Sequence, residues 1–237
     1  MSGFIDAPSP NFNERKLPVS LIILHYTGME SGDVALQRMC DPQAQVSAHY
    51  MVEVDGRVFR LVADEKRAWH AGVSYWHGER DINSASIGIE IVNGGHDFGL
   101  PAYPETQIDA VIQLVKRLMA EHALSPDCVI GHSDIAVERK EDPGEHFPWQ
   151  RLVAEGCALA LSAEGSSEDP EADLVRAGYN PDAPVEDTVK AFQRRHRQTC
   201  IDGQIDAETS ALIRAAALAG RWSSAGQSRD RGENEGR

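Results

Sequence analysis

The sequence lacks any long hydrophobic run: nowhere do about 18 apolar residues follow one another, the length typical of a transmembrane helix. Its N-terminus, MSGFIDAPSP, lacks the basic start, apolar middle and small-residue cleavage site of a signal peptide. No cysteine suited to a lipid anchor lies near it. We therefore expect no membrane partner and a cytoplasmic protein, with a periplasmic location reached by an unrecognised route as the alternative.

Basic residues are scarce relative to acidic ones. The chain has 23 Lys and Arg against 37 Asp and Glu, which gives a net charge of -14. A nucleic-acid-binding protein needs Lys and Arg to neutralise phosphates, so the charge argues against a nucleic-acid partner. It places no limit on a small substrate of neutral or mixed charge.

Closely spaced cysteine pairs are also absent. The chain has four cysteines, none of them in a C-x-x-C pair: Cys40, Cys128, Cys157 and Cys200. Such spacing is poor evidence for a disulfide framework or for a zinc site made of thiolates. We expect four reduced thiols in a reducing compartment.

What is present is an interleaving of strand and helix patterns up to residue 161. Strands are expected at 20–24, 48–54, 57–62, 86–93 and 128–130, and helices at 33–39, 105–122 and 149–161. Residues 1–18, polar with three prolines, are expected to form an irregular arm. Strands interleaved with helices predict an α/β fold in which helices flank the sheet.

The chain changes character after residue 161. Residues 162–171 contain no large apolar side chain and are typical of a linker. Residues 172–222 show helical patterns, but a unit this small must pack tightly or lean on its neighbour. Residues 223–237 are polar and charged, which predicts a disordered tail. We therefore predict a catalytic domain over 1–161, a linker, a small helical domain and a tail.

Two of the nine histidines stand at strand ends. His25 directly follows the apolar run 20–24, and His132 follows 128–130 through a single glycine. Side chains at strand ends lie at the rim of an α/β sheet, where sites are built. Asp142 follows ten positions after His132. Two imidazoles and one carboxylate suit zinc with one open position, although structural histidines and a surface aspartate would satisfy the same spacing.

Glu90 stands out on the strand expected at 86–93. Alternation places Ile87, Ile89 and Ile91 on one face and Glu90 on the other, with Gly88 and Val92 beside it. These small neighbours leave room for a ligand next to the carboxylate. The alternative is a solvated carboxylate on an edge strand.

Six motifs, in this order, resemble the N-acetylmuramoyl-L-alanine amidases of the AmpD and AmiD type over roughly residues 10–155. They are LHYT (24–27), VSAHY (46–50), RAWHAG (67–72), SIGIE (86–90), GHSDIA (131–136) and RKEDPG (139–144). The resemblance implies the mixed-sheet fold shared by peptidoglycan recognition proteins and T7-type lysozyme. It also implies cleavage of the amide between the muramic acid lactyl group and L-alanine.

The resemblance also assigns roles to residues. It implies a Zn²⁺ cofactor held by three ligands, His25, His132 and Asp142. It places the catalytic glutamate at Glu90 and a lysine near the scissile carbonyl at Lys140. One local departure is that Val137 and Glu138 stand where the family often has proline and glycine or aspartate.

The substrate groove of the family runs near three further residues. We expect substrate contacts from His49, Trp69 and His70. Trp69 offers a flat face for a sugar or peptide, and the alternative is a core aromatic. For His49 a purely structural role is the alternative.

The C-terminal segments KAFQRRH (190–196) and DGQIDAET (202–209) resemble the peptidoglycan-binding domain 1 family, a three-helix module. Its first helix is abbreviated here, so a purely structural appendage is the alternative to glycan binding.

The predicted function is therefore a zinc amidase that takes muropeptides, in particular 1,6-anhydro-muropeptides of cell-wall recycling, and acts as a monomer. The alternatives are an amidase that acts on intact peptidoglycan and a protein that binds muropeptides without cutting them.

Overall fold

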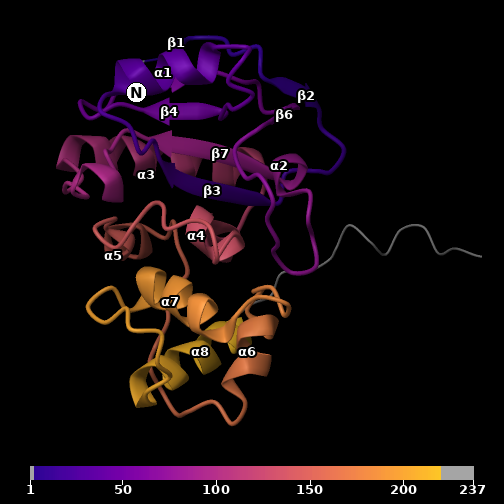
Figure 1. Cartoon of the computed structure of the whole chain (residues 1–237), viewed down its shortest axis with the longest axis vertical. Coiled ribbons are helices and arrows are strands. Elements are labelled where there is room, and N and C mark those ends of the chain that lie inside the picture. The colour runs from indigo at the N-terminus through magenta and orange to yellow at the C-terminus, as the bar shows by residue number, and fades with distance from the viewer. Residues whose placement is uncertain (1–2, 220–237) are drawn as a thin grey trace, which may run out of the picture.

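The computed structural model describes residues 3–219, which contain a mixed six-stranded sheet in the order β1-β5-β4-β7-β3-β8 (Figure 1). Its strands are β1 (Ile5–Asp6), β3 (Leu21–Tyr26), β4 (Tyr50–Val52), β5 (Val58–Arg60), β7 (Ser86–Ile91) and β8 (Val129–Gly131). Strands β4, β7, β3 and β8 run parallel, whereas β4 and β5 form an antiparallel hairpin. The predicted mixed sheet flanked by helices is confirmed.

The prediction of an irregular N-terminal arm was wrong. Strand β1 pairs with the edge strand β5, and β2 (Phe12–Glu14) pairs with β6 (Lys66–Ala68) in a second, two-stranded sheet. Both pairings join segments more than 50 residues apart in the chain. Local patterns carry no record of such distant partners, because strand formation depends strongly on the neighbouring strand.

Alternation along β3 and β7 divides the sheet into two faces. Ile22, Leu24, Ile87, Ile89 and Ile91 belong to the core shared with α3 (Glu105–Glu121) and α5 (Trp149–Ala154). The helix predicted for residues 105–122 thus packs its apolar side on this face. Helix α5 is shorter than predicted, because Gly156 adopts a φ of 69° and the chain turns away.

Helix α1 (Gly32–Cys40) covers one part of the opposite face of the sheet, and the C-terminal helices cover another part. Helix α1 packs over β4 and β5 through Ala35 and Met39. Leu21 and Ile23 of β3 instead belong to a core shared with the C-terminal helices. Figure 1 shows these coverings at opposite ends of the molecule. Residues of β3 and β7 that lie between them on this face are therefore available for a site.

The C-terminal part contains three helices between residues 162 and 219: α6 (Pro170–Arg176), α7 (Val185–His196) and α8 (Ala207–Ala219). Helix α6 begins two residues inside the predicted linker, with Asp169 as its N-cap. Asp206 Oδ1 accepts from the Thr209 amide at 2.9 Å and so caps the start of α8. The predicted disordered tail, 223–237, lies outside the described residues.

These helices pack against the rest of the chain. Tyr179, Val189, Phe192 and Ile213 share one core with Leu21, Ile23 and Ile130 of the sheet. Figure 1 shows α7 beside α4 (His132–Ile135) and α5. The short helices α2 (Ile82–Ala85), η1 (His96–Phe98) and η2 (Pro126–Cys128) complete the described elements.

Two compositional predictions bear on the whole fold. All four cysteines are free, as expected from their spacing. Among residues 3–219, no helix is both long enough and apolar enough to cross a bilayer.

Candidate metal centre and active site

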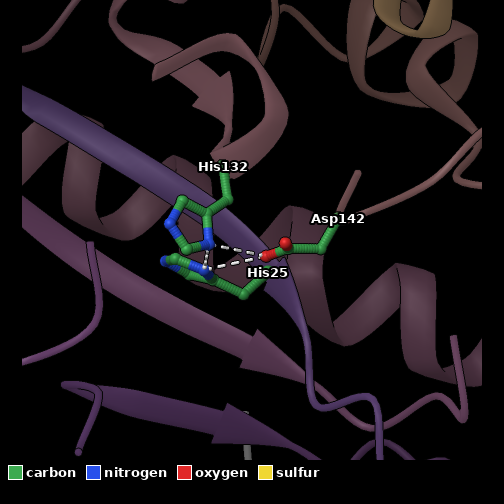
Figure 2. A group of neighbouring side chains, drawn as sticks. All are labelled: His25, His132 and Asp142. Carbon is green, nitrogen blue, oxygen red and sulfur yellow. Dashed lines mark hydrogen bonds and ion pairs between the residues drawn. The ribbon is translucent and has the colours of Figure 1, made fainter. Parts of the chain in front are cut away.

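Three side chains converge where β3 and β8 end (Figure 2). His25 is the fifth residue of β3, and His132 opens α4 directly after β8. Asp142 comes from the loop that follows α4. The His25 Nδ1 atom lies 2.9 Å from His132 Nδ1 and 3.0 Å from Asp142 Oδ2, and His132 Nδ1 lies 3.0 Å from the same oxygen. Parallel neighbouring strands bring their carboxyl ends together, which explains the meeting of the two histidines.

The donor atoms fit a small divalent cation. All three side chains are buried, and their donor atoms lie within 4.8 Å of one another. Ligands about 2.0 Å from a tetrahedral zinc ion stand about 3.3 Å apart, close to the separations seen here. The pairing of two imidazoles with one carboxylate is a common zinc set that leaves one position open.

The protonation states agree with metal binding. Burial and the nearby His132 lower the pKa of His25 to about 4, so its imidazole is neutral at pH 7. Burial alone would raise the pKa of Asp142, but His132 and the hydrogen bonds of both imidazoles outweigh it and lower that pKa. A neutral imidazole and an ionised carboxylate are the forms in which these side chains bind a metal.

Glu90 lies next to the candidate metal ligands. It is the register partner of His25 on the neighbouring strand β7, and its side chain points to the same face of the sheet. Strand β7 lies between β4 and β3, so the alternative of a carboxylate on an edge strand is wrong. Within the described chain, Glu90 Oε2 is shielded from solvent and has no hydrogen-bond partner. Burial and the charge of Asp142 raise the pKa of Glu90.

A pocket of about 390 Å³ opens above these residues. Its wall includes seven of the eight predicted site residues: His25, Trp69, His70, Glu90, His132, Lys140 and Asp142. Arg38 and Met39 of α1 and Asp97 of η1 also line it. The structure thus brings together residues spread over more than 100 positions of the sequence.

Trp69 and Lys140 are half-buried at this pocket. The Trp69 indole donates to Asn13 Oδ1 at 3.0 Å, which holds the ring in place. Trp69 therefore borders the pocket and is not a core aromatic.

His49 is the predicted site residue that does not line the pocket. It is fully buried, and its Nδ1 accepts the Gly88 amide at 3.0 Å. Its Nε2 lies 3.1 Å from the Lys66 carbonyl. These contacts favour the structural role that the sequence left open for it.

His70 lines the pocket, yet both of its ring nitrogens face protein atoms. Its Nδ1 lies 2.9 Å from His25 Nε2, and its Nε2 lies 3.3 Å from Ser86 Oγ. Burial and the nearby His25 lower its pKa well below the usual value, so the ring is neutral.

Sequence reasoning missed three groups around the site: Asn83, Ser86 and the Ala71 carbonyl. Ser86 shares a strand face with Gly88 and Glu90, and this alternation could have singled it out. Asn83 of α2 and the Ala71 carbonyl carry no sequence signal, since only the fold brings them to their partners.

The α/β fold holds two histidines and a carboxylate beside an open pocket, and a glutamate lies next to them. This arrangement is typical of metal-dependent hydrolases. Comparison with known proteins gives the family. Residues 15–145 match the family model Amidase_2, described as N-acetylmuramoyl-L-alanine amidase. The chain belongs to this family.

Individual relatives agree with this assignment. The chain is 35% identical to the N-acetylmuramoyl-L-alanine amidase AmiD of Escherichia coli over 229 residues, covering 83% of this chain and 82% of AmiD. It is 31% identical to the 1,6-anhydro-N-acetylmuramyl-L-alanine amidase AmpD of Haemophilus influenzae, covering 62% of this chain and 88% of AmpD. AmpDh3 of Pseudomonas aeruginosa, solved with an anhydromuramic pentapeptide, superposes with a TM-score of 0.74 at 35% identity, covering 83% of this chain and 90% of AmpDh3.

The solved structure of AmiD shows how far the likeness extends. This complex with anhydro-N-acetylmuramic acid-L-Ala-D-γ-Glu-L-Lys superposes with a TM-score of 0.75 at 30% identity, covering 88% of this chain and 97% of AmiD. Because residues 1–161 make up only about two thirds of the chain, the match reaches into the C-terminal helices. The match to AmpD covers 62% of the chain, close to the share of the sheet domain alone.

Proposed function

We propose that this amidase is zinc-dependent and hydrolyses the amide between the lactyl group of N-acetylmuramic acid and L-alanine in 1,6-anhydro-muropeptides. The observation that carries the proposal is the buried group His25, His132 and Asp142 beside Glu90 in an open pocket. The five residues to which the family resemblance gives a ligand or catalytic role, His25, Glu90, His132, Lys140 and Asp142, all line this pocket.

His25, His132 and Asp142 are the residues that would hold the zinc ion. A zinc ion bound there supplies Lewis acidity, which lowers the pKa of water and polarises a carbonyl. The family membership of the chain and the fit of the three donor atoms support this assignment.

Glu90 is the proposed general base. It accepts a proton from the attacking water as a bond forms between the water oxygen and the lactyl carbonyl carbon. It then returns the proton to the alanine nitrogen as the C–N bond breaks, so that a free peptide amine and a muramic acid carboxyl group result. The unpartnered Oε2 and the raised pKa of Glu90 suit a group that must hold and release a proton.

Lys140 and Trp69 are proposed to act on the substrate from the pocket wall. The Lys140 ammonium stabilises the negative charge that develops on the carbonyl oxygen. Trp69 packs against the sugar or the stem peptide. His49, which lies outside the pocket wall, is proposed to hold the backbone of β7 through Gly88.

The substrate class is supported by the relatives. AmiD and AmpDh3 were solved with anhydromuramic peptides, and AmpD is named for 1,6-anhydro-N-acetylmuramyl-L-alanine cleavage. We propose the same class here and a place in cell-wall recycling in the cytoplasm. We further propose that the protein acts as a monomer.

The domain division is also part of the proposal: a catalytic domain over 1–161, a linker over 162–171 and a helical domain over 172–222. The resemblance of this last segment to the peptidoglycan-binding domain 1 family supports a role in contacting glycan. A preference for intact peptidoglycan is the second candidate, because the likeness to AmiD extends into these helices.

Incubation of purified protein with anhydro-muropeptides and with intact sacculi, followed by mass spectrometry, tests the function. We expect release of the stem peptide with a free L-alanine amine, faster from the soluble fragments, lost with a chelator and restored by zinc. Faster release from sacculi would favour the second candidate. Binding without cleavage of either substrate would identify a muropeptide-binding protein.

A further inference from the structure

We propose that the His70–Ala71 segment orients both histidine ligands of the metal, and that His70 is a positioning residue whose ring donates no hydrogen bond to substrate. The inference rests on the proposed zinc site and adds an outer layer to it. It follows from two contacts that join the imidazoles to this segment and two further contacts that fix the segment itself.

The first contact joins His25 to His70. The Nδ1 atom of His25 faces His132 and Asp142, so it is the atom that needs a lone pair for a metal. The remaining proton of neutral His25 must then lie on Nε2, which is 2.9 Å from His70 Nδ1. His25 therefore donates to His70, and the two rings meet edge to face at 84°.

The second contact sets the tautomer of His70. Because its Nδ1 accepts from His25, its own proton lies on Nε2, 3.3 Å from Ser86 Oγ. The Ser86 hydroxyl proton is directed elsewhere, to the Ile82 carbonyl at 2.5 Å, which leaves the Oγ lone pairs for His70. The chain of donors runs in one direction from His25 to the Ile82 carbonyl.

The third contact joins the other ligand to the next residue along the segment. His132 Nε2 lies 3.1 Å from the Ala71 carbonyl, which can only accept. The proton of His132 therefore lies on Nε2, and Nδ1 is left for the metal. Metal-bound histidines generally donate their second N–H to a protein acceptor in this way.

The fourth contact anchors the segment itself. The buried Asn83 side chain accepts from the His70 amide at 2.9 Å and from the Ala71 amide at 2.8 Å through its Oδ1 atom. One side-chain oxygen thus holds the two residues that orient the two ligands.

Gly88 makes room for the His70 ring. A Cβ atom at Gly88 would lie 2.5 Å from His70 Cγ, so the ring packs directly on the backbone of β7. The sequence suggested that Gly88 leaves room for a ligand beside Glu90. In the structure, the His70 ring occupies this room. Since both nitrogens of His70 are engaged, no N–H of this ring is left for the substrate.

The test compares two variants of similar shape, His70→Asn and His70→Leu. The Asn side-chain oxygen can take the place of His70 Nδ1 as the acceptor for His25, whereas Leu offers no acceptor. The measurement is the Kd for zinc of the metal-free full-length protein, by competition with a chromophoric chelator. We expect His70→Leu to weaken zinc binding by about 10- to 100-fold and His70→Asn to stay close to wild type.

Equal Kd values for the two variants would overturn the proposal, whether both matched wild type or both were weakened. Trp69→Phe is the matched control, since Trp69 borders the same pocket without contacting a ligand, and it should leave the zinc Kd unchanged. Far-UV circular dichroism of each metal-free variant checks folding. Failure of the wild-type protein to bind one zinc ion would instead contradict the proposed metal site itself.

A second readout separates orientation from general stability. In the ¹⁵N spectrum of zinc-loaded wild type, the His25 and His132 side chains should both appear as Nε2–H tautomers. In His70→Leu, the Nε2–H signal of His25 should exchange faster with water while that of His132 is retained. An Nδ1–H tautomer at either ligand would contradict the assignment.

Discussion

The Tyr179 phenol donates to Asp134 Oδ1 at 2.5 Å, and this buried bond joins the C-terminal helices to the helix that opens with His132. Asp134 Oδ2 also accepts from the Gly131 amide at 2.8 Å. The guanidinium of Arg195, on α7, lies 3.6 Å from the same carboxylate oxygen. The C-terminal part of the chain therefore holds the segment that carries His132, one of the proposed metal ligands.

A second set of contacts holds the loop that carries Asp142, another of the proposed metal ligands. Arg194 Nη2 donates to Glu141 Oε1 at 2.9 Å, directly beside Asp142. The Gln198 side-chain amide donates to the carbonyls of Glu145 and Phe147 at 2.6 and 2.7 Å. The C-terminal helices thus act on the shape of the site whether or not they bind glycan.

Tyr179→Phe should lower the free energy of unfolding by about 1–3 kcal/mol, because it leaves a buried carboxylate oxygen of Asp134 without its donor. Urea denaturation followed by circular dichroism measures the change. Tyr75→Phe is the control, since the half-buried Tyr75 ring packs on Arg80. An equal and small effect of both variants would show that the Tyr179 bond contributes little.

Glu90→Gln should reduce kcat by about 10²-fold or more while the zinc content stays at one ion per chain, because the amide cannot accept a proton from water. Peptide release from an anhydro-muropeptide gives kcat, and atomic absorption gives the metal content. Glu138→Gln changes an exposed carboxylate outside the pocket wall and should leave kcat unchanged. Near-normal turnover in Glu90→Gln would move the base to another residue.

Lys140→Met should reduce kcat by about 10²- to 10³-fold, because the charge on the carbonyl oxygen loses a stabilising cation. Zinc affinity should change little, since Lys140 is not a proposed ligand. Lys116→Met is the control, because Lys116 pairs with Glu155 on the surface of α3. A rise in KM with unchanged kcat would show that Lys140 binds substrate only in the ground state.

Zinc should raise the melting temperature of the metal-free protein, and Asp142→Asn should remove most of the rise. At free zinc about 100-fold above Kd, the folded state gains about 2.7 kcal/mol. Differential scanning fluorimetry with a zinc series measures this effect. Asp97→Asn, which alters the same pocket wall, should keep the full rise. A full rise in Asp142→Asn would exclude Asp142 from the ligand set.

Acid should destabilise the metal-free protein partly through His49. Burial, with Arg15 nearby, lowers the pKa of His49 to about 3 from 6.5. Between these values the unfolded chain binds a proton that the folded protein does not, so the free energy of unfolding falls as pH drops below 6.5. The slope from one such group is about 1.4 kcal/mol per pH unit.

His49→Asn should make this pH dependence shallower by about that slope, because the amide does not titrate and its oxygen can still accept the Gly88 N–H. Urea midpoints between pH 7.5 and pH 5 for both metal-free proteins, each at several pH values, provide the comparison. Parallel profiles would mean that His49 titrates alike in both states.

The buried faces of the strands and helices in the sheet domain could be predicted, because they follow from the spacing of apolar residues within each element. Ile87, Ile89 and Ile91 alternate with Ser86, Gly88 and Glu90, and this period of two assigns the two faces of β7 without any knowledge of its partners. The same holds for α3, whose apolar stripe follows the helical period. Family motifs then named the candidate ligands and Glu90, residues that periodicity alone leaves among other possibilities.

Tertiary structure decided what depends on distant partners. Strands β1 and β2 form because β5 and β6 lie beside them, and the prolines of that segment gave no sign of this pairing. The proposed role of the His70–Ala71 segment depends on contacts with β3, α2, β7 and α4, which only the fold brings together. The C-terminal part of the chain reaches the segments of the proposed metal ligands through Tyr179 and Arg194. The sequence by itself determined which chemical groups are present and which face each strand residue takes. Only the fold decided which groups meet, because a hydrogen bond depends on distances of about 3 Å between atoms that the chain places far apart.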